Sequence, residues 1–138
     1  MSRVALLSVV FAAFAAATAA SAHDWRRPDL NNWYGSLKRP GISPAQPYGI
    51  ASCCSKTDCH TTEAELRKGD WWARIGRPRK NGDWDLLDWV RVPPEAVLQQ
   101  QDNPTGEGVI CHSTAAPMGA AVSSKDVSIW CFVPPAES

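Results

Sequence analysis

Residues 71–90 read WWARIGRPRKNGDWDLLDWV, and this stretch decides the fold class that we expect. Apolar and polar side chains alternate over residues 71–75, which is the periodicity of a half-buried strand. Asn81-Gly82 is a preferred sequence for a tight hairpin turn. The apolar residues of 84–92 can return as a second strand, with a break near Leu87-Asp88. The stretch therefore predicts a β-hairpin.

The sequence on either side of this hairpin predicts further strands and two short helices. The runs 109–112 and 127–133 have the length and composition of strands. One helix is predicted over residues 29–37 and another over 62–69, where Thr62-Glu63-Ala64-Glu65 fits a capping box. We therefore expect a mainly β fold, with α+β as the alternative. It would be a small antiparallel sheet or a partly closed barrel of about four strands, with one or two short helices and disulfide staples.

The N-terminus has the pattern of a secretory signal peptide. Arg3 precedes an almost continuous apolar run over residues 4–17, and Ala20-Ser21-Ala22 supplies the small residues that signal peptidase requires. This run is too short to cross a bilayer of about 30 Å as a helix. We expect cleavage between Ala22 and His23, with Ala19-Ala20 as a second possible site, and hence a periplasmic or secreted protein.

Cleavage would divide the chain into a signal peptide (1–22), an N-terminal arm with a short helix (23–50) and a disulfide-linked β-rich domain (51–138). The whole chain has 14 basic and 14 acidic residues, so the loss of Arg3 leaves 13 and 14 and a net charge of −1. Nucleic-acid binding needs clustered positive charge, which this balance does not supply. No second long apolar stretch follows, so we expect no membrane span after cleavage.

Five cysteines follow the predicted cleavage site: Cys53, Cys54, Cys59, Cys111 and Cys131. An odd number in an oxidising compartment predicts two disulfides and one remaining cysteine. Cys53 and Cys54 should bond different partners, because successive side chains of an extended chain point in opposite directions. We expect the cluster at 53–59 to be joined to Cys111 and Cys131, with about 3–4 kcal/mol of stabilisation per bridge.

Two other uses of the cysteines stay open. One is a redox-active thiol, although the chain has no C-x-x-C sequence within a thioredoxin-like pattern. The other is a metal site of Cys and His ligands, although the spacings match no standard zinc finger. Its ligands would come from Cys54, Cys59, His60, Cys111 and His112.

The predicted cleavage would make His23 the first residue of the exported protein. An N-terminal histidine offers an α-amine and an imidazole to one metal ion, a combination that suits Cu(II). Exported copper monooxygenases that act on polysaccharides use this arrangement with a second histidine, and here His60 or His112 could supply it. The alternative is that His23 is an unconstrained polar terminus. We expect no obligatory cofactor, and copper is the candidate metal.

Seven tryptophans are an unusually large number for a chain of 138 residues. Most should lie in the core, because large aromatic side chains add buried area to a small domain. Trp71 and Trp72 are adjacent on a predicted strand, so one ring must face away from the other. Exposed aromatic patches mark binding sites. We predict a binding surface that includes Trp72, Arg74 and Trp89.

Five motifs are spread over most of the chain after the signal peptide: His23-Asp24-Trp25, Cys53-Cys54-Ser55-x-x-Asp58-Cys59, Val92-Pro93-Pro94-Glu95, Asn103-Pro104-Thr105-Gly106 and Cys131-Phe132-Val133-Pro134-Pro135. Together they resemble a group of small, exported, uncharacterised bacterial proteins with a CCSxxDC motif and a CFVPP-like C-terminal sequence. The resemblance implies export, a bacterial origin and the five-cysteine pattern. It assigns no catalytic residue.

An enzyme is the weaker functional class. The sequence has no G-x-S-x-G elbow, no H-E-x-x-H and no P-loop. We therefore favour an exported, non-catalytic protein that binds an envelope protein or a glycan. A copper protein built on His23 is the first alternative, and a thiol-redox or Cys/His metal site is the second.

Overall fold

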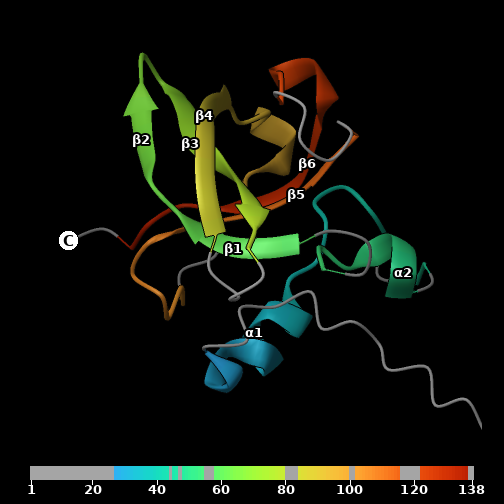
Figure 1. Ribbon diagram of the computed structural model, residues 1–138. Helices are drawn as coiled ribbons and strands as arrows, with labels where there is room; N and C mark the ends of the chain where they lie inside the picture. The colour runs from blue at the N-terminus through green and yellow to red at the C-terminus, as the bar shows by residue number, and fades with distance from the viewer. Residues whose placement is uncertain are drawn as a thin grey trace, which may run out of the picture.

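The computed structural model describes residues 27–43, 45–46, 48–54, 58–79, 84–99, 102–115 and 122–136. Its strands form two three-stranded antiparallel sheets with the orders β1-β5-β6 and β2-β3-β4 (Figure 1). The strands are β1 (Asp58–Thr62), β2 (Ala64–Arg67), β3 (Asp70–Pro78), β4 (Trp84–Arg91), β5 (Gly108–Thr114) and β6 (Val127–Val133). The helices are α1 (Asn31–Ser36) and α2 (Tyr48–Ala51), with single 3-10 turns at Pro28–Leu30, Pro94–Ala96 and Ser124–Asp126. The expected mainly β class is confirmed, as two small sheets rather than a barrel.

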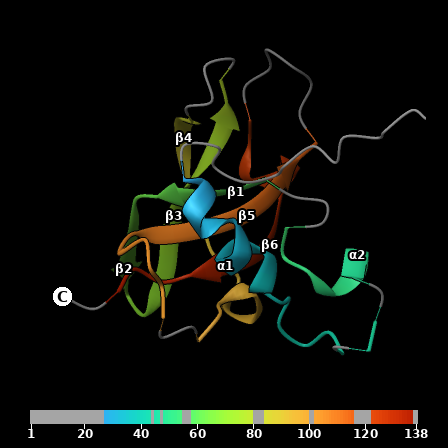
Figure 2. The same ribbon diagram turned by 90° about the horizontal axis from the view of Figure 1, so that it is seen from below.

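The β1-β5-β6 sheet is the middle layer of the molecule. Alternate residues of β5 face its two sides, as the pleat of a strand requires. Val109 and Cys111 pack in one core cluster with residues of the N-terminal arm, whereas Ile110 packs in a second cluster with Phe132. The helix α1 lies over the first of these faces (Figure 2).

The β2-β3-β4 sheet covers the other face of the middle layer. Ala73 and Ile75 of β3 are fully buried and pack in the same cluster as Ile110 and Phe132. The alternation predicted over residues 71–75 is therefore present, with Ala73 and Ile75 directed toward the core. Trp72 and Arg74, which alternate with these two residues, lie on the outer face of this sheet.

The predicted helix over residues 62–69 is wrong, because this segment forms the end of β1 and all of β2. The Thr62 hydroxyl donates to the carbonyl of Arg74 at 2.6 Å instead of capping a helix. Lys68 and Gly69 both have positive φ, 51° and 88°, which is the conformation of a two-residue hairpin turn. Gly69 therefore permits a β2-β3 hairpin rather than ending a helix.

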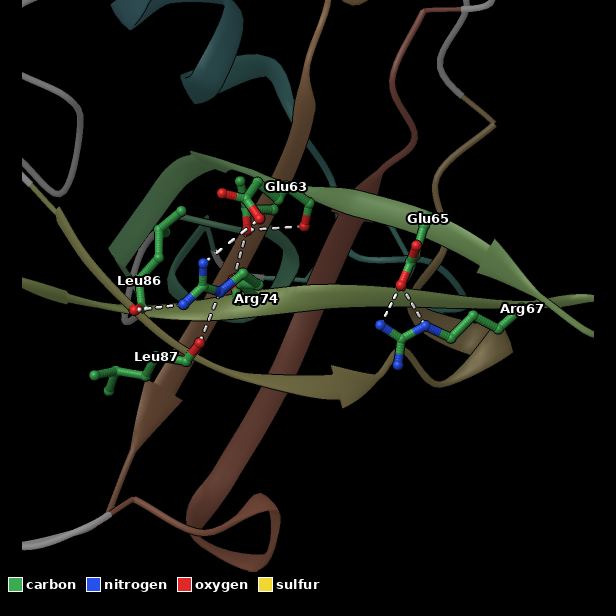
Figure 3. A network of polar contacts seen from close by, with 7 residues as sticks. Glu63, Glu65, Arg67, Arg74, Leu86 and Leu87 are labelled. Carbon is green, nitrogen blue, oxygen red and sulfur yellow. Dashed lines mark hydrogen bonds and ion pairs between the residues drawn. The ribbon is translucent and has the colours of Figure 1, made fainter.

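The break predicted near Leu87-Asp88 is a β-bulge in β4. Arg74 pairs with Trp89 and Gly76 pairs with Leu86, so Leu87 and Asp88 together oppose one residue of β3. The Arg74 guanidinium donates to the carbonyls of Leu86 and Leu87 at 2.9 and 2.8 Å (Figure 3). It thereby satisfies two backbone acceptors at the bulge.

The N-terminal arm packs against the middle sheet. The predicted helix over 29–37 is present as the turn at Pro28–Leu30 followed by α1, and Leu30, Tyr34 and Leu37 are buried. A backbone hydrogen bond from Cys53 to Leu37 fastens the arm to the segment after α2. The arm therefore contributes one wall of the first core cluster.

Several sequence-based expectations lie outside the described residues. These are the signal peptide and its cleavage site, His23, Trp25 and the turn at Asn81-Gly82. Within the described part of the chain, no helix combines the length and apolar character needed to cross a membrane.

Candidate functional site

All five cysteines lie in the core cluster between the middle sheet and the N-terminal arm. Cys53 forms a disulfide with Cys131 of β6, across 78 residues of sequence and with the two Cα atoms 5.7 Å apart. The Cys54 sulfur lies beside two other cysteines, Cys59 of β1 and Cys111 of β5. The cysteines at 53–59 are thus joined to both C-terminal cysteines, as the sequence led us to expect.

Cys54, Cys59 and Cys111 form a group of three sulfurs, which we call the sulfur cluster. Their Sγ atoms lie within 4.8 Å of one another. Cys59 is within disulfide-bonding reach of both other sulfurs, which are 3.9 Å from each other. Because one sulfur forms one disulfide, Cys59 can be bonded to only one of its two neighbours at a time. Three thiolates in this arrangement could instead hold a soft metal ion.

His60 of β1 and His112 of β5 meet on the opposite face of the same sheet. They are separated by 52 residues in the sequence, yet their Nε2 atoms are 3.1 Å apart. The two side chains are almost completely buried, with exposures of 0% and 3%. The middle sheet therefore carries sulfur ligands on one face and imidazole ligands on the other.

The hydrogen bonds around this pair indicate where each ring carries its proton. Nδ1 of His60 donates to the Thr61 carbonyl at 2.8 Å, since a carbonyl can only accept. Nε2 of His112 accepts from the Gly76 amide at 3.1 Å. In their neutral forms both rings therefore turn an unprotonated Nε2 toward the other. Such a pair is stabilised by a proton or a metal ion that both nitrogens can share.

The burial of His112 also changes the pKa of its ring. Loss of water around the ring lowers the pKa of His112 to about 4. Its Nδ1 is buried and has no hydrogen-bond partner among the described residues.

Gly76 and Trp84 complete the surroundings of the histidine pair. The His60 ring stacks on the Trp84 indole with centroids 4.1 Å apart and planes inclined by 25°. A Cβ atom on Gly76 would lie 2.7 Å from Nε2 of His60 and 2.8 Å from the Trp84 ring. Only glycine lets β3 pass this close to both rings.

The outer face of the β2-β3-β4 sheet carries Trp72 and Trp89, with Arg67 beside both. The Arg67 Cζ atom is 5.0 Å from the Trp72 ring centroid and 4.6 Å from that of Trp89. These distances are within the range of cation–π contacts. We call these three residues the aromatic face. Both indoles are half-buried.

Three arginines of this sheet have an acidic partner. Arg67 pairs with Glu65, Arg74 with Glu63 at 3.5 Å, and Arg91 with Asp70 at 2.8 Å (Figure 3 shows the first two). The hydrogen bond from Arg91 lowers the pKa of the Asp70 carboxyl, so Asp70 stays ionised at neutral pH. Exposed pairs of this kind add little stability. Their effect is that the face carries charge without a net excess.

A hollow of about 310 Å³ opens next to the two tryptophans. It lies between the β4 side of one sheet and the start of β6 in the other. Its walls combine aromatic, aliphatic and polar side chains: Trp72, Trp89, Val90, Arg91, Pro93, Ser124, Val127 and Ile129. Mixed walls of this kind are typical of small-molecule sites.

The structure brings some of the predicted site residues together and separates others. Trp72, Trp89 and Arg74 share one sheet face, but Arg74 uses its guanidinium for Glu63 and the carbonyls of β4. The sequence analysis missed Arg67, because its segment was expected to be helical. Strand alternation over residues 64–67 would have placed it beside the tryptophans.

Comparisons of the chain with protein-family models, with curated proteins and with solved structures give no match.

Proposed function

We propose that this protein is an exported, non-catalytic module that binds a neutral glycan of the cell envelope through the aromatic face. The observation that carries the proposal is the placement of Trp72, Arg67 and Trp89 around one patch next to a hollow of about 310 Å³. Indole rings can cover the apolar faces of sugar rings, while arginine N–H groups donate to hydroxyls.

The charge pattern favours an uncharged ligand. The arginines near the tryptophans are paired with Glu63, Glu65 and Asp70, so an anionic ligand would have to displace a carboxylate. A neutral, hydroxyl-rich ligand can use the same donors and acceptors without that competition. A glycan meets this condition better than an acidic peptide does.

Two further features support a site of action outside the cytoplasm. Disulfides persist in oxidising compartments, and this chain has a bridge from Cys53 to Cys131 in addition to the sulfur cluster. Residues 1–22 have the pattern of a signal peptide. We propose that the protein works in the periplasm or the extracellular medium of a bacterium.

Titration calorimetry of the purified protein against soluble fragments of neutral envelope polysaccharides tests the proposal. Trp72→Ala and Trp89→Ala should each weaken binding at least about tenfold, the usual effect of removing an aromatic anchor. Leu66→Ala is the matched control, because Leu66 is an exposed apolar residue (59%) outside the aromatic face. Equal affinity in all variants, or no binding of any neutral glycan, would show that the proposal is wrong.

The histidine pair favours copper binding as a second candidate function. Two imidazole nitrogens that bind the same ion at about 2.0 Å lie about 2.8–3.3 Å apart for ligand angles between about 90° and 109°. The Nε2 atoms of His60 and His112 are 3.1 Å apart. His23 would supply the third ligand of such a site after signal-peptide cleavage.

Copper titration of the processed protein distinguishes this candidate from adventitious binding. We expect one Cu(II) per chain, lost in His60→Gln, His112→Gln and His23→Ala alike. Copper that is lost only in His23→Ala would be held by the N-terminus alone, and the second candidate would be discarded. Circular dichroism of each variant verifies that the fold is retained.

A further inference from the structure

The sulfur cluster is a group of three mutually adjacent sulfurs, of which only two can be joined in a disulfide at one time. Cys59 lies beside both Cys54 and Cys111. The other two cysteines of the chain are joined to each other, so neither can take up the extra sulfur. We propose that Cys54, Cys59 and Cys111 form a thiol–disulfide exchange site, in which Cys59 alternates between its two neighbours.

Cys111 reaches Cys59 because the two residues are directly opposite on paired strands. Cys59 of β1 and Cys111 of β5 are register partners, with Cα atoms 4.1 Å apart. This distance is close to that of a directly opposed, non-hydrogen-bonded pair in an antiparallel ladder. The bridge between them closes a separation of 52 residues and fastens β1 to β5.

Cys54 reaches the same sulfur from the other side of the cluster. It follows α2, and its Cα atom is 6.2 Å from that of Cys59, within the ordinary range for a disulfide. The bridge between them closes a separation of only five residues. The two pairings therefore differ in which segments they hold together, although both use Cys59.

A thiol at Cys54 has a hydrogen-bond acceptor nearby. The Cys54 sulfur lies 3.5 Å from the carbonyl oxygen of Tyr34, to which an S–H group can donate. The same sulfur is 3.9 Å from that of Cys111. All three sulfurs are within the buried cluster, but Cys54 is the most accessible, with 7% exposure against 0% for Cys59 and 1% for Cys111.

The exchange step is balanced within the chain. The Cys54 thiol loses its proton, and the thiolate attacks Sγ of Cys59. The bond between Cys54 and Cys59 forms while the bond between Cys59 and Cys111 breaks, and the electron pair leaves on Cys111. Cys111 then takes up one proton. The step consumes no oxidant or reductant, because one disulfide and one thiol are present before and after it.

Exchange gives the protein a thiol that can appear at two places. With Cys59 bonded to Cys111, the thiol is at Cys54, beside the N-terminal arm. With Cys59 bonded to Cys54, the thiol is on β5 and the covalent link between β1 and β5 is absent. The disulfide between Cys53 and Cys131 is the same in both states, so it holds the arm against β6 throughout.

Disulfide mapping of the full, air-oxidised chain tests the proposal. Samples are unfolded in acid, where exchange is quenched, alkylated at mildly acidic pH and digested with pepsin for mass spectrometry. We expect two bonding patterns, one with Cys54–Cys59 and an alkylated Cys111, and one with Cys59–Cys111 and an alkylated Cys54. The bridge from Cys53 to Cys131, expected in every molecule, verifies that the work-up did not scramble the bridges.

A second arm of the experiment asks whether the two states interconvert. Iodoacetamide is added to the native protein, where it should react first with Cys54. If exchange occurs, the Cys54–Cys59 form disappears with time and all molecules end with Cys59–Cys111 and an alkylated Cys54. A single pairing at the start, or two pairings whose fractions do not change, would overturn the proposal.

Two serine variants provide matched controls. Cys54→Ser should contain only Cys59–Cys111, and Cys111→Ser should contain only Cys54–Cys59, each beside Cys53–Cys131. Both should have no free thiol, against one in the wild type. Two free thiols in a folded Cys111→Ser protein would mean that Cys54 cannot bond Cys59, and the proposal would be wrong. The wild-type map decides the matter if that variant does not fold.

Discussion

Acidification of the metal-free protein tests the environment of His112 most directly. In the unfolded chain this histidine should titrate near its ordinary pKa of 6.5, whereas burial lowers the pKa of His112 in the folded protein to about 4. Between these values the unfolded state binds a proton that the folded state does not. Stability should therefore be complete above about pH 6.5, decrease as the pH falls toward 4, and then level off with respect to this group.

The size of the effect follows from the difference between the two pKa values. At about 1.4 kcal/mol for each unit, this difference corresponds to about 3 kcal/mol of folding free energy. A loss of that size is a large part of the total free energy of unfolding, which is usually about 5–15 kcal/mol. The carboxyls of Asp29 and Asp70 do not disturb this window, because arginine partners lower their pKa values below the ordinary 3.8.

Urea unfolding at pH 7, 5.5 and 4, followed by tryptophan fluorescence, measures the loss. His112→Gln is the matched variant, because its amide oxygen can accept from the Gly76 amide but does not titrate. The variant should be less sensitive to acid than the wild type by about 3 kcal/mol over this range. Parallel behaviour of the two proteins would refute the reasoning. A wild type that gains stability toward pH 5 would show instead that the folded histidine pair takes up a proton.

Three substitutions, and a fourth that serves as a control, test the strands that position the sites, each by urea unfolding. Gly76→Ala should cost about 1–3 kcal/mol, since the new Cβ would overlap His60; an unchanged midpoint would contradict the close packing. Arg74→Lys should cost about 1–3 kcal/mol through the loss of its bonds to β4 carbonyls, whereas Arg79→Lys, in an exposed ion pair, should change stability by less than about 1 kcal/mol. Lys68→Gly should stabilise by up to about 1 kcal/mol because φ is positive there; destabilisation would argue against the two-residue turn.

The strands could be predicted where one local signal was sufficient. Residues 127–133 are apolar except for Ser128 and are followed by two prolines, and β6 has these bounds. Residues 62–69 contain a capping box and a glycine, which together predicted the start and the end of a short helix. Tertiary pairing overrode this local pattern, because Thr62 bonds to β3 and Lys68-Gly69 turns the chain back on itself. No local propensity contains that information.

The candidate sites depend on strand register, which a single sequence does not determine. His60 and His112 meet because β1 pairs with β5 across 52 residues, and the same pairing sets Cys59 opposite Cys111. The sequence indicated that one cysteine would be left over, but not that Cys59 would have two neighbours. Trp72 could be identified from its adjacency to Trp71, whereas Arg67 required knowledge of the β2-β3 hairpin.

The dipeptides Cys59-His60 and Cys111-His112 place one side chain on each face of the middle sheet. Deleting one residue just before either dipeptide would shift that strand by one residue relative to its partner strand. Each of the two side chains would then point to the opposite face of the sheet. A histidine would then sit among the sulfurs and a cysteine beside the remaining imidazole. Length changes in the connections to β1 and β5 are consequently tolerable only if they leave this register intact.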